Sequence, residues 1–417
     1  MSAGRSSQML PRPPGAMAIG GAAPALNAAF ANGLVGIALV YTLLFDFLDE
    51  RVRIAIAGML GVAIVMRCLI SWPQARTATF LFAGLILTCA FQFIFVADPL
   101  AHSPVDYASL ALRLMTSIAV FMYFGHERNI VTPHILIVLC LGIALTALWT
   151  AATGAQVDYA GTLRPATFTG GPEGVHSSGY VTAAALIGVT VLWRRDWIPT
   201  GLSVVLGAPL VVLVIAYQVR TTWMMIAAYL AACLLLHFRR QSRDASWLLL
   251  PVGGVLALLI ALVFSMDVNF VELSSGRTSV YEERLDLIVG RPAMELLFGT
   301  GPGSELLPST VWWWEAKNSH NDFIDLTIQI GLVGLVLFVS LLAVTWRVLD
   351  ETRMPLFVMF VVSSLFSNGL LARPIVAMLF LAFALVPSNP HSIGSRSPPH
   401  RPTARTVPAP HRHRPVW

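Results

Sequence analysis

Charge is the scarcest feature of this 417-residue chain, because Asp, Glu, Lys and Arg together make up only 12% of it. A soluble chain carries about twice that share. Hydrophobic residues make up 56%, and the mean hydropathy is +0.72. Apolar runs close to the roughly 20 residues needed to cross a bilayer recur along the chain, without period-two alternation. The sequence therefore predicts an all-α, polytopic membrane protein and argues against an outer-membrane barrel.

Cysteine motifs and a cleavable leader are also missing. Neither a CxxC pair nor a Cys/His metal spacing occurs, so we expect no zinc site and no required disulfide. The four cysteines lie far apart within apolar runs: Cys68, Cys89, Cys140 and Cys233. Residues 1–25 lack the apolar core of a signal peptide, so the first membrane segment is expected to direct insertion. The glycine-rich stretch LLFGTGPGS at 296–304 lacks the Lys-Ser/Thr pair of a P-loop and predicts a turn.

Twelve apolar segments are predicted to cross the membrane, on a window of about 19 residues. Their approximate limits are 28–48, 54–72, 78–97, 108–125, 131–152, 176–194, 199–217, 220–238, 247–266, 320–346, 354–370 and 373–387. The chain then divides into an N-terminal segment (1–27), helices 1–9 (28–266), a large loop (267–319), helices 10–12 (320–387) and a tail (388–417). The tail holds five arginines and no acid, which predicts a disordered cytoplasmic segment, with or without affinity for anionic lipid.

The distribution of arginine and lysine predicts the orientation of these segments. With the N-terminus inside, the inner segments and the tail carry 16 cations and the outer segments carry 9. Both termini are therefore expected to be cytoplasmic, with the large loop on the outer face. Four of the outer cations lie in this loop, against the usual bias: Arg277, Arg284, Arg291 and Lys317. Either the loop needs positive charge, or a long loop is translocated regardless of its charge.

The large loop contains a predicted helix in the stretch ELSSGRTSVYEERLDLIVGRP at 272–292. On this helix Arg277 and Arg284 lie two turns apart on nearly the same face, with Tyr281 between them. Two guanidinium groups and a phenol on one stripe suit a phosphate, which Arg can bind through two hydrogen bonds. In the alternative interpretation the helix is solvated and its arginines pair with the neighbouring acids: Glu282, Glu283 and Asp286.

Other outer residues are weaker candidates. Arg220 lies at a tight turn between two segments, where it either snorkels to the membrane surface or holds an anion beneath the large loop. The loop before the sixth segment offers three polar side chains: Arg164, Glu173 and His176. The Trp triplet at 312–314 is most simply an interfacial anchor, with carbohydrate contact as the alternative. Arg67 and Arg113 lie within segments and are expected to be paired or to snorkel.

The stretch KNSHNDFIDL at 317–326 places polar groups where an apolar segment begins. A helix that starts near Ser319 puts three of them on one stripe: Asp322, Asp325 and Gln329. His320 then shares a different face with Gly331 and Gly334, and these glycines allow another helix to approach closely. Asn318 and Ser319 suit ordinary helix capping. Capping does not require a histidine, so His320 is predicted to be a general base that works on a lipid-linked anionic substrate.

The stretch SHNDFIDLTIQIGLVGLVLF at 319–338 resembles the signature of the O-antigen ligase and Wzy-type polymerase superfamily, in which His-Asn precedes an apolar helix and Gly-x-x-Gly. The preceding loop, SSGRTSVYEERLDLIVGRPAMELLFGTGPGS, and the helix start VRTTWMMIAAYLA are also similar to that family. Together they cover roughly Arg220 to Phe338. Two positions depart from the family pattern: Val219 replaces a small polar residue, and Gln329 stands where relatives often carry an acid.

This resemblance implies about 12 transmembrane helices in the bacterial inner membrane, with a large periplasmic loop between helices 9 and 10. It implies a metal-independent glycosyltransferase, without a cofactor, that moves a glycan from undecaprenyl diphosphate to an acceptor hydroxyl. His320 corresponds to the base of that family, Arg220 and Arg277 to residues that hold the diphosphate, and Arg284 is a further diphosphate-binding candidate. The supporting candidates are Asn321, Asp322, Asp325 and Tyr281.

Three functions remain open at this point. A polymerase joins lipid-linked oligosaccharide repeats of an exopolysaccharide or O-antigen, whereas an O-antigen ligase moves the glycan to lipid A-core. A transporter of lipid-linked oligosaccharides would show polar groups spread through the segments and repeated halves, and no internal repeat is found. The expected partners are the lipid-linked oligosaccharide, the acceptor glycan, membrane lipid and other polysaccharide-assembly proteins, with no nucleic acid.

Overall fold

A computed structural model describes residues 22–44, 48–70, 76–96, 104–127, 132–159, 162–165, 174–241, 276–311, 316–367, 371 and 374–387. The helices are α1 (Ala22–Leu44), α2 (Glu50–Ile70), α3 (Arg76–Phe95), α4 (Pro104–His126), α5 (Pro133–Thr153), α6 (Gly174–Arg194), α7 (Thr200–Tyr217), α8 (Arg220–Gln241), α11 (Arg277–Val289), α12 (Ala293–Phe298), α13 (Asp322–Arg347), α14 (Arg353–Phe366) and α15 (Pro374–Ala384). The predicted segment 247–266, Glu173, the Trp triplet and the tail lie outside the described residues.

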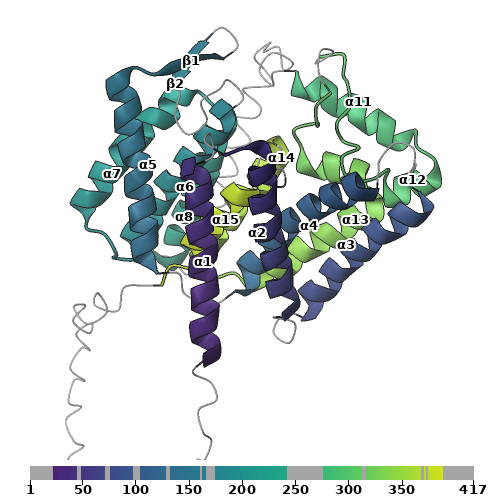
Figure 1. Ribbon diagram of the computed structural model, residues 1–417, viewed down its shortest axis with the longest axis horizontal. Coiled ribbons are helices and arrows are strands. Elements are labelled where there is room, and N and C mark those ends of the chain that lie inside the picture. The colour runs from purple at the N-terminus through teal and green to yellow at the C-terminus, as the bar shows by residue number, and fades with distance from the viewer. Residues whose placement is uncertain are drawn as a thin grey trace, which may run out of the picture.

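The hydropathy pattern predicted the helices well. Each predicted apolar segment within the described residues coincides with a helix (Figure 1). Six of these helices are long and apolar enough to cross a membrane: α3, α4, α5, α7, α8 and α13. The chain is therefore a helical protein with the composition and helix lengths of a membrane protein.

One short hairpin departs from the predicted all-α class. Strand β1 (Gln156–Tyr159) pairs antiparallel with β2 (Thr162–Pro165), and Val157 lies opposite Arg164. The sequence predicts a loop in this stretch, because four-residue strands are too short for a clear alternating pattern. Figure 1 shows the hairpin and α11 toward the same end of the bundle.

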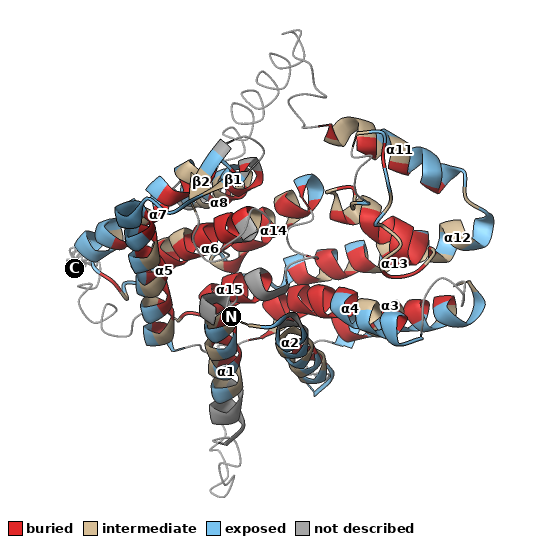
Figure 2. Ribbon diagram, turned by 45° about the horizontal axis from the view of Figure 1, so that its top comes forward, coloured by how far each residue is buried: buried red, intermediate tan, exposed pale blue. Residues whose placement is uncertain are grey.

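Helix α4 lies at the centre of the bundle and is buried along its second half (Figure 2). Its Phe121 ring packs edge-on against Phe338 of α13 at 5.9 Å and against Phe360 of α14 at 5.4 Å. Phe360 in turn packs edge-on against Phe380 of α15 at 5.5 Å. Such edge-to-face pairs add to the gain from burial of the rings. This aromatic cluster joins four helices from both halves of the sequence.

A buried ion pair joins α2 to α4. The Nε atom of Arg67 lies 3.1 Å from Oε2 of Glu127, whose side chain is only 3% exposed. Of the two sequence interpretations of Arg67, pairing is therefore confirmed. Removal of either partner would leave a buried charge without compensation.

Helix α13 is broken at Gly331, whose φ of 67° and ψ of −173° lie far from helical values. This conformation is essentially open only to glycine. A Cβ atom at Gly331 would overlap the carbonyl group of Leu297, and one at Gly299 would overlap the carbonyl group of Gln329. The glycines therefore let the end of α12 contact the backbone of α13 directly. The predicted close approach at Gly331 is confirmed, with the end of a short helix as the partner.

The break leaves backbone carbonyl groups open to partners outside α13. The carbonyl oxygen of Ile328 accepts hydrogen bonds from the Thr300 amide (3.1 Å) and the Arg291 guanidinium (3.0 Å). That of Gln329 accepts from the Gly301 amide (3.0 Å) and the Gln92 side chain (2.6 Å). Of the stretch 296–304, predicted as a turn, residues 299–304 form one, with positive φ at its three glycines, whereas residues 296–298 belong to α12. These bonds fix the turn against the first half of α13.

We expect the Gly331→Ala variant to be destabilised by at least about 2 kcal/mol, because the new methyl group meets backbone atoms that cannot rotate away. The thermal midpoint of the detergent-solubilised protein measures this effect. Gly142→Ala in α5 is the matched control, since a Cβ there meets nothing within 4 Å. Equal midpoints for the two variants would show that the contact at Gly331 does not constrain the fold.

Candidate functional site

Helix α11 packs against α13 and directs one polar stripe toward the rest of the protein. Three side chains form this stripe, as predicted, but each has a different partner: Arg277, Tyr281 and Arg284. Both arginines donate to backbone carbonyl groups rather than to the acids of α11. Glu283 instead accepts hydrogen bonds from the backbone and hydroxyl groups of Thr310. The described contacts therefore disfavour the alternative of a solvated, self-paired helix.

Arg284 is buried and holds the loop that leads to α13. Its guanidinium donates to the carbonyl oxygens of Leu307 (2.6 Å), Pro308 (3.2 Å) and Lys317 (3.4 Å). Leu307 and Lys317 also pair with each other through two backbone hydrogen bonds of 3.2 Å. Burial lowers the pKa of Arg284, which the nearby carboxylates partly oppose. The described contacts thus give Arg284 a positioning role, and its predicted diphosphate binding stays a prediction.

Arg277 is the first residue of α11 and reaches a different part of the bundle. One of its Nη atoms donates to the carbonyl oxygen of Phe366, at the last turn of α14, at 2.7 Å. The side chain is only half-buried. A guanidinium carries five N–H groups, and among the described residues this bond uses one of them.

Arg220 begins α8, and its side chain lies outside the described residues. Helices α8 and α14 contact each other, and Leu236 near the end of α8 lines a pocket with Met354 in the first turn of α14. The two helices are therefore antiparallel. A rise of 1.5 Å per residue places Arg220 about 24 Å from Leu236 and Phe366 about 18 Å from Met354 along them. The start of α8 thus lies near the end of α14, which Arg277 contacts.

His320 lies immediately before α13 and has a left-handed backbone, with a φ of 61°. A positive φ is uncommon for residues other than glycine and marks a local constraint. The hydroxyl group of Tyr281 donates to the His320 carbonyl oxygen at 3.3 Å. Burial raises the pKa of Tyr281, so its hydroxyl stays protonated as a donor at neutral pH. Tyr281 therefore connects His320 to the same face of α11 that carries Arg277.

The residues on either side of His320 are held by separate bonds. Asn321 caps α13, because its side-chain oxygen accepts from the amides of Phe323 (3.0 Å) and Ile324 (3.2 Å). Asp325 accepts from the backbone amide of Ser319 at 2.8 Å. The predicted helix start near Ser319 is wrong, and so is the helical face assigned to His320. No sequence pattern indicated the left-handed turn at His320. Because of this turn, His320 lies outside the helix, which begins after the cap residue Asn321.

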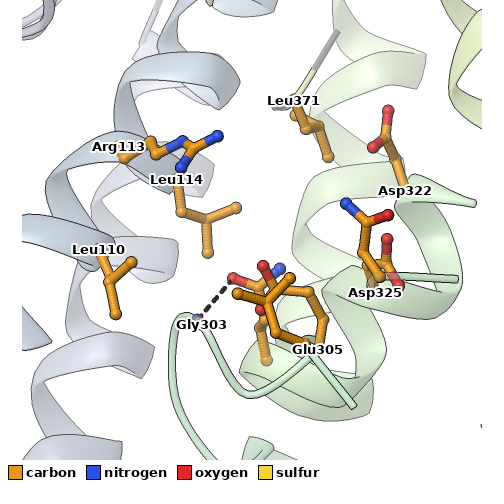
Figure 3. A pocket seen from close by; sticks show the side chains of 11 residues that line it. Leu110, Arg113, Leu114, Gly303, Glu305, Asp322, Asp325 and Leu371 are labelled. Carbon is orange, nitrogen blue, oxygen red and sulfur yellow. Dashed lines mark hydrogen bonds between the residues drawn. The ribbon is translucent and has the colours of Figure 1, made fainter. Parts of the chain in front are cut away.

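The predicted polar stripe of α13 is confirmed, since its three residues line one pocket: Asp322, Asp325 and Gln329. Asn318 lines the same pocket, which has a volume of about 100 Å³. Figure 3 shows Leu110 and Arg113 on the opposite wall, which α4 forms. His320 is not among the lining residues. The polar stripe and His320 therefore lie on different sides of the turn that precedes α13.

Sequence patterns did not identify two of the pocket-lining residues as functional candidates. Glu305 follows the glycine turn, and burial raises the pKa of its carboxyl group. Its Oε2 atom is shielded from solvent without a hydrogen-bond partner among the described residues. Arg113 was expected only to pair or snorkel, yet it lines this pocket across from Glu305. One sequence feature could have indicated Glu305, namely its place directly after the glycine-rich turn. No local sequence pattern indicated Arg113.

The weaker outer candidates lie at other positions. Arg164 is half-buried on β2, and His176 is half-buried in the first turn of α6. One turn further along α6, the hydroxyl group of Tyr180 bonds that of Ser367 at 2.5 Å. The start of α6 therefore also reaches the end of α14, which brings His176 toward the Arg277 side of the site.

No protein-family model and no curated protein matches the chain by sequence. Membership of the O-antigen ligase and Wzy-type superfamily therefore stays a prediction from the residues quoted above.

Replacing Arg284 by Lys is expected to loosen the loop at 307–317, because an ammonium group cannot reach three carbonyl groups with the geometry of a guanidinium. Charged hydrogen bonds of this kind contribute about 1.5–3 kcal/mol. We therefore expect amide hydrogen exchange at Leu307 and Lys317 to rise at least tenfold. Arg277→Lys on the same helix is the matched control and should leave these amides protected. Unchanged protection in Arg284→Lys would contradict the positioning role.

Proposed function

We propose that this protein is a polytopic inner-membrane glycosyltransferase that uses a polyprenyl-diphosphate-linked glycan as its donor. The reaction polymerises oligosaccharide repeats of an exopolysaccharide or O-antigen at the periplasmic face. The observation that carries this proposal is the arrangement on α11. There Tyr281 bonds the backbone of His320, and Arg277, one turn earlier, reaches the end of α14 near Arg220. The backbone of the general-base candidate thus contacts α11 one turn from Arg277, a candidate for diphosphate binding.

Each of these groups has a role in the proposed transfer reaction. The acceptor hydroxyl gives its proton to the His320 imidazole while its oxygen bonds to the anomeric carbon of the donor sugar. The bond from that carbon to the diphosphate oxygen breaks, and the diphosphate leaves with the bonding electrons. Arg277 and Arg220 neutralise the charge that develops on this leaving group, which is the role a metal ion plays elsewhere.

The proposed membrane arrangement extends the helices described above. Twelve spans, counting the segment 247–266, place both termini in the cytoplasm and the loop 267–319 in the periplasm. Supporting this, α11, the hairpin and the start of α8 all fall on segments that the charge bias assigns to one face. Buried ion pairs such as Arg67–Glu127 then fall toward the opposite, cytoplasmic ends of their helices.

A lipid A-core ligase is the second candidate within the same chemistry. The base and the cationic pair serve either reaction, because only the acceptor differs. A transporter of lipid-linked oligosaccharides is the distant alternative. The clustering of His320, Tyr281 and Arg277 at one end of the bundle favours an enzyme, because a transporter needs its polar groups near the middle of the membrane.

We expect His320→Asn to reduce glycan transfer at least 100-fold, the usual lower contribution of a general base. Asn tolerates the left-handed backbone at this position, so the variant removes the imidazole without new strain. His237→Ala, on an exposed side chain near the other end of α8, is the control and should transfer normally. Polymer formation at the normal rate by a well-folded His320→Asn protein would eliminate His320 as the base.

Purified protein given lipid-linked repeats alone is expected to lengthen them, with products resolved as a ladder on a gel. Addition of lipid A-core should leave the ladder unchanged for a polymerase. Transfer that appears only after lipid A-core is added would establish the ligase instead. No product with either acceptor, in protein that moves lipid-linked repeats across vesicles, would establish the transporter.

A further inference from the structure

The pocket between α4, α13 and the glycine turn is lined by polar groups that are not all hydrogen-bonded to described residues. Gln329 is only 8% exposed, and its side-chain oxygen accepts from the Gly303 amide at 3.4 Å. The side chain of Gln329 lines the pocket. The Oε2 atom of Glu305, in the same pocket, is shielded from solvent and without a hydrogen-bond partner among the described residues. Buried polar groups are usually satisfied, so such groups indicate a missing ligand.

The mixture of groups identifies the ligand chemistry. Carboxylate and amide oxygens accept hydrogen bonds, while Gln329 and Arg113 donate them. Apolar side chains complete the wall: Leu110, Leu114, Leu306 and Leu371. A sugar ring presents hydroxyl groups that both donate and accept, together with apolar C–H faces, and matches this lining. Among the described residues no three side chains are placed to hold a metal ion, which disfavours a cation as the occupant.

Size and charge restrict the choice further. A volume of about 100 Å³ exceeds the roughly 10–15 Å³ that one water needs, so the pocket has room for a group larger than a water. Three carboxyl groups and one guanidinium line the pocket, so acids outnumber bases: Glu305, Asp322, Asp325 and Arg113. Only Arg113 could pair with the carboxylate of an anionic sugar, whereas all three carboxyl groups can bond neutral hydroxyl groups, whether they are ionised or protonated. The lining therefore favours a neutral sugar.

We infer that this pocket is the subsite for a neutral monosaccharide unit of the acceptor glycan. The inference rests on the proposed function, and it names the part of the site that recognises the acceptor. Asn318 lines the pocket two residues before His320, and Asp325 holds the amide of Ser319 between them. A sugar bound here contacts Asn318, at the start of the turn that carries His320. Glu305 and Gln329 are the residues that set its specificity.

The test measures binding without any transfer reaction. The full-length protein in detergent is titrated by saturation-transfer NMR with methyl glycosides of glucose, galactose, mannose, rhamnose and N-acetylglucosamine, and with glucuronate. At least one neutral glycoside should bind, and glucuronate should bind at least tenfold more weakly. Glu305→Gln and Gln329→Leu should each weaken the neutral sugar about tenfold. Glu295→Gln on α12, outside the pocket, is the control and should bind like the wild type.

Inorganic diphosphate, titrated separately, keeps the two proposals distinguishable. Arg277→Met should lose diphosphate binding and keep sugar binding, whereas Gln329→Leu should do the reverse. Absence of binding by every neutral glycoside, equal affinity for glucuronate, or unchanged affinity in both pocket variants would each overturn the sugar subsite. If sugar binding depends on the pocket but no transfer is found with any acceptor, the subsite stands and the transferase proposal falls.

Discussion

The contact between the backbones of α12 and α13 is the constraint on which the rest of the site depends. Only the absence of a Cβ at Gly299 and Gly331 allows it. The contact turns the carbonyl groups of Ile328 and Gln329 outward, where they hold the glycine turn by hydrogen bonds. That turn in turn positions Glu305 and brings the Gly303 amide to Gln329. A helix unbroken at Gly331 would bond these carbonyl groups internally and leave the turn without an anchor.

Charge divides the site into two halves. Arg277 and the start of α8 lie on the side of α11 and α14, whereas the acids of α13 and Glu305 face α4. His320 lies at the turn between these halves. On the proposed reaction, the diphosphate binds to the arginines of the first half and the acceptor sugar binds to the polar groups of the second. The donor and the acceptor would therefore be sorted by the chemistry of the two halves before they meet at the histidine.

The features that the sequence predicted correctly depend on the local periodicity of the chain and on the length of its apolar segments. Hydropathy located the helices, because crossing a bilayer requires a fixed length, and the 3.6-residue repeat placed Asp322, Asp325 and Gln329 on one face. The sequence could not predict the left-handed turn at His320, which is held by a hydrogen bond from Tyr281 and by the bond of the Ser319 amide to Asp325. The cap is local, but Asn318 and Ser319 are also suitable cap residues, so the sequence did not single out Asn321. The place of Arg113 in the pocket could not be predicted, because Arg113 and Glu305 lie about 190 positions apart in the sequence and no local pattern encodes their proximity.

The strain at His320 is itself informative. A left-handed, non-glycine backbone costs about 1–3 kcal/mol and persists only when its surroundings impose it. Here they do so on both sides, since Asp325 holds Ser319 and the cap at Asn321 fixes the following residue. Tyr281 holds the carbonyl group between them. Hydrogen bonds at three consecutive residues, 319 to 321, therefore fix the backbone around this histidine before any substrate arrives. An ordinary helix start needs only the cap, and the additional bonds fit the proposal that His320 is the general base, because a base needs a fixed backbone beneath its imidazole.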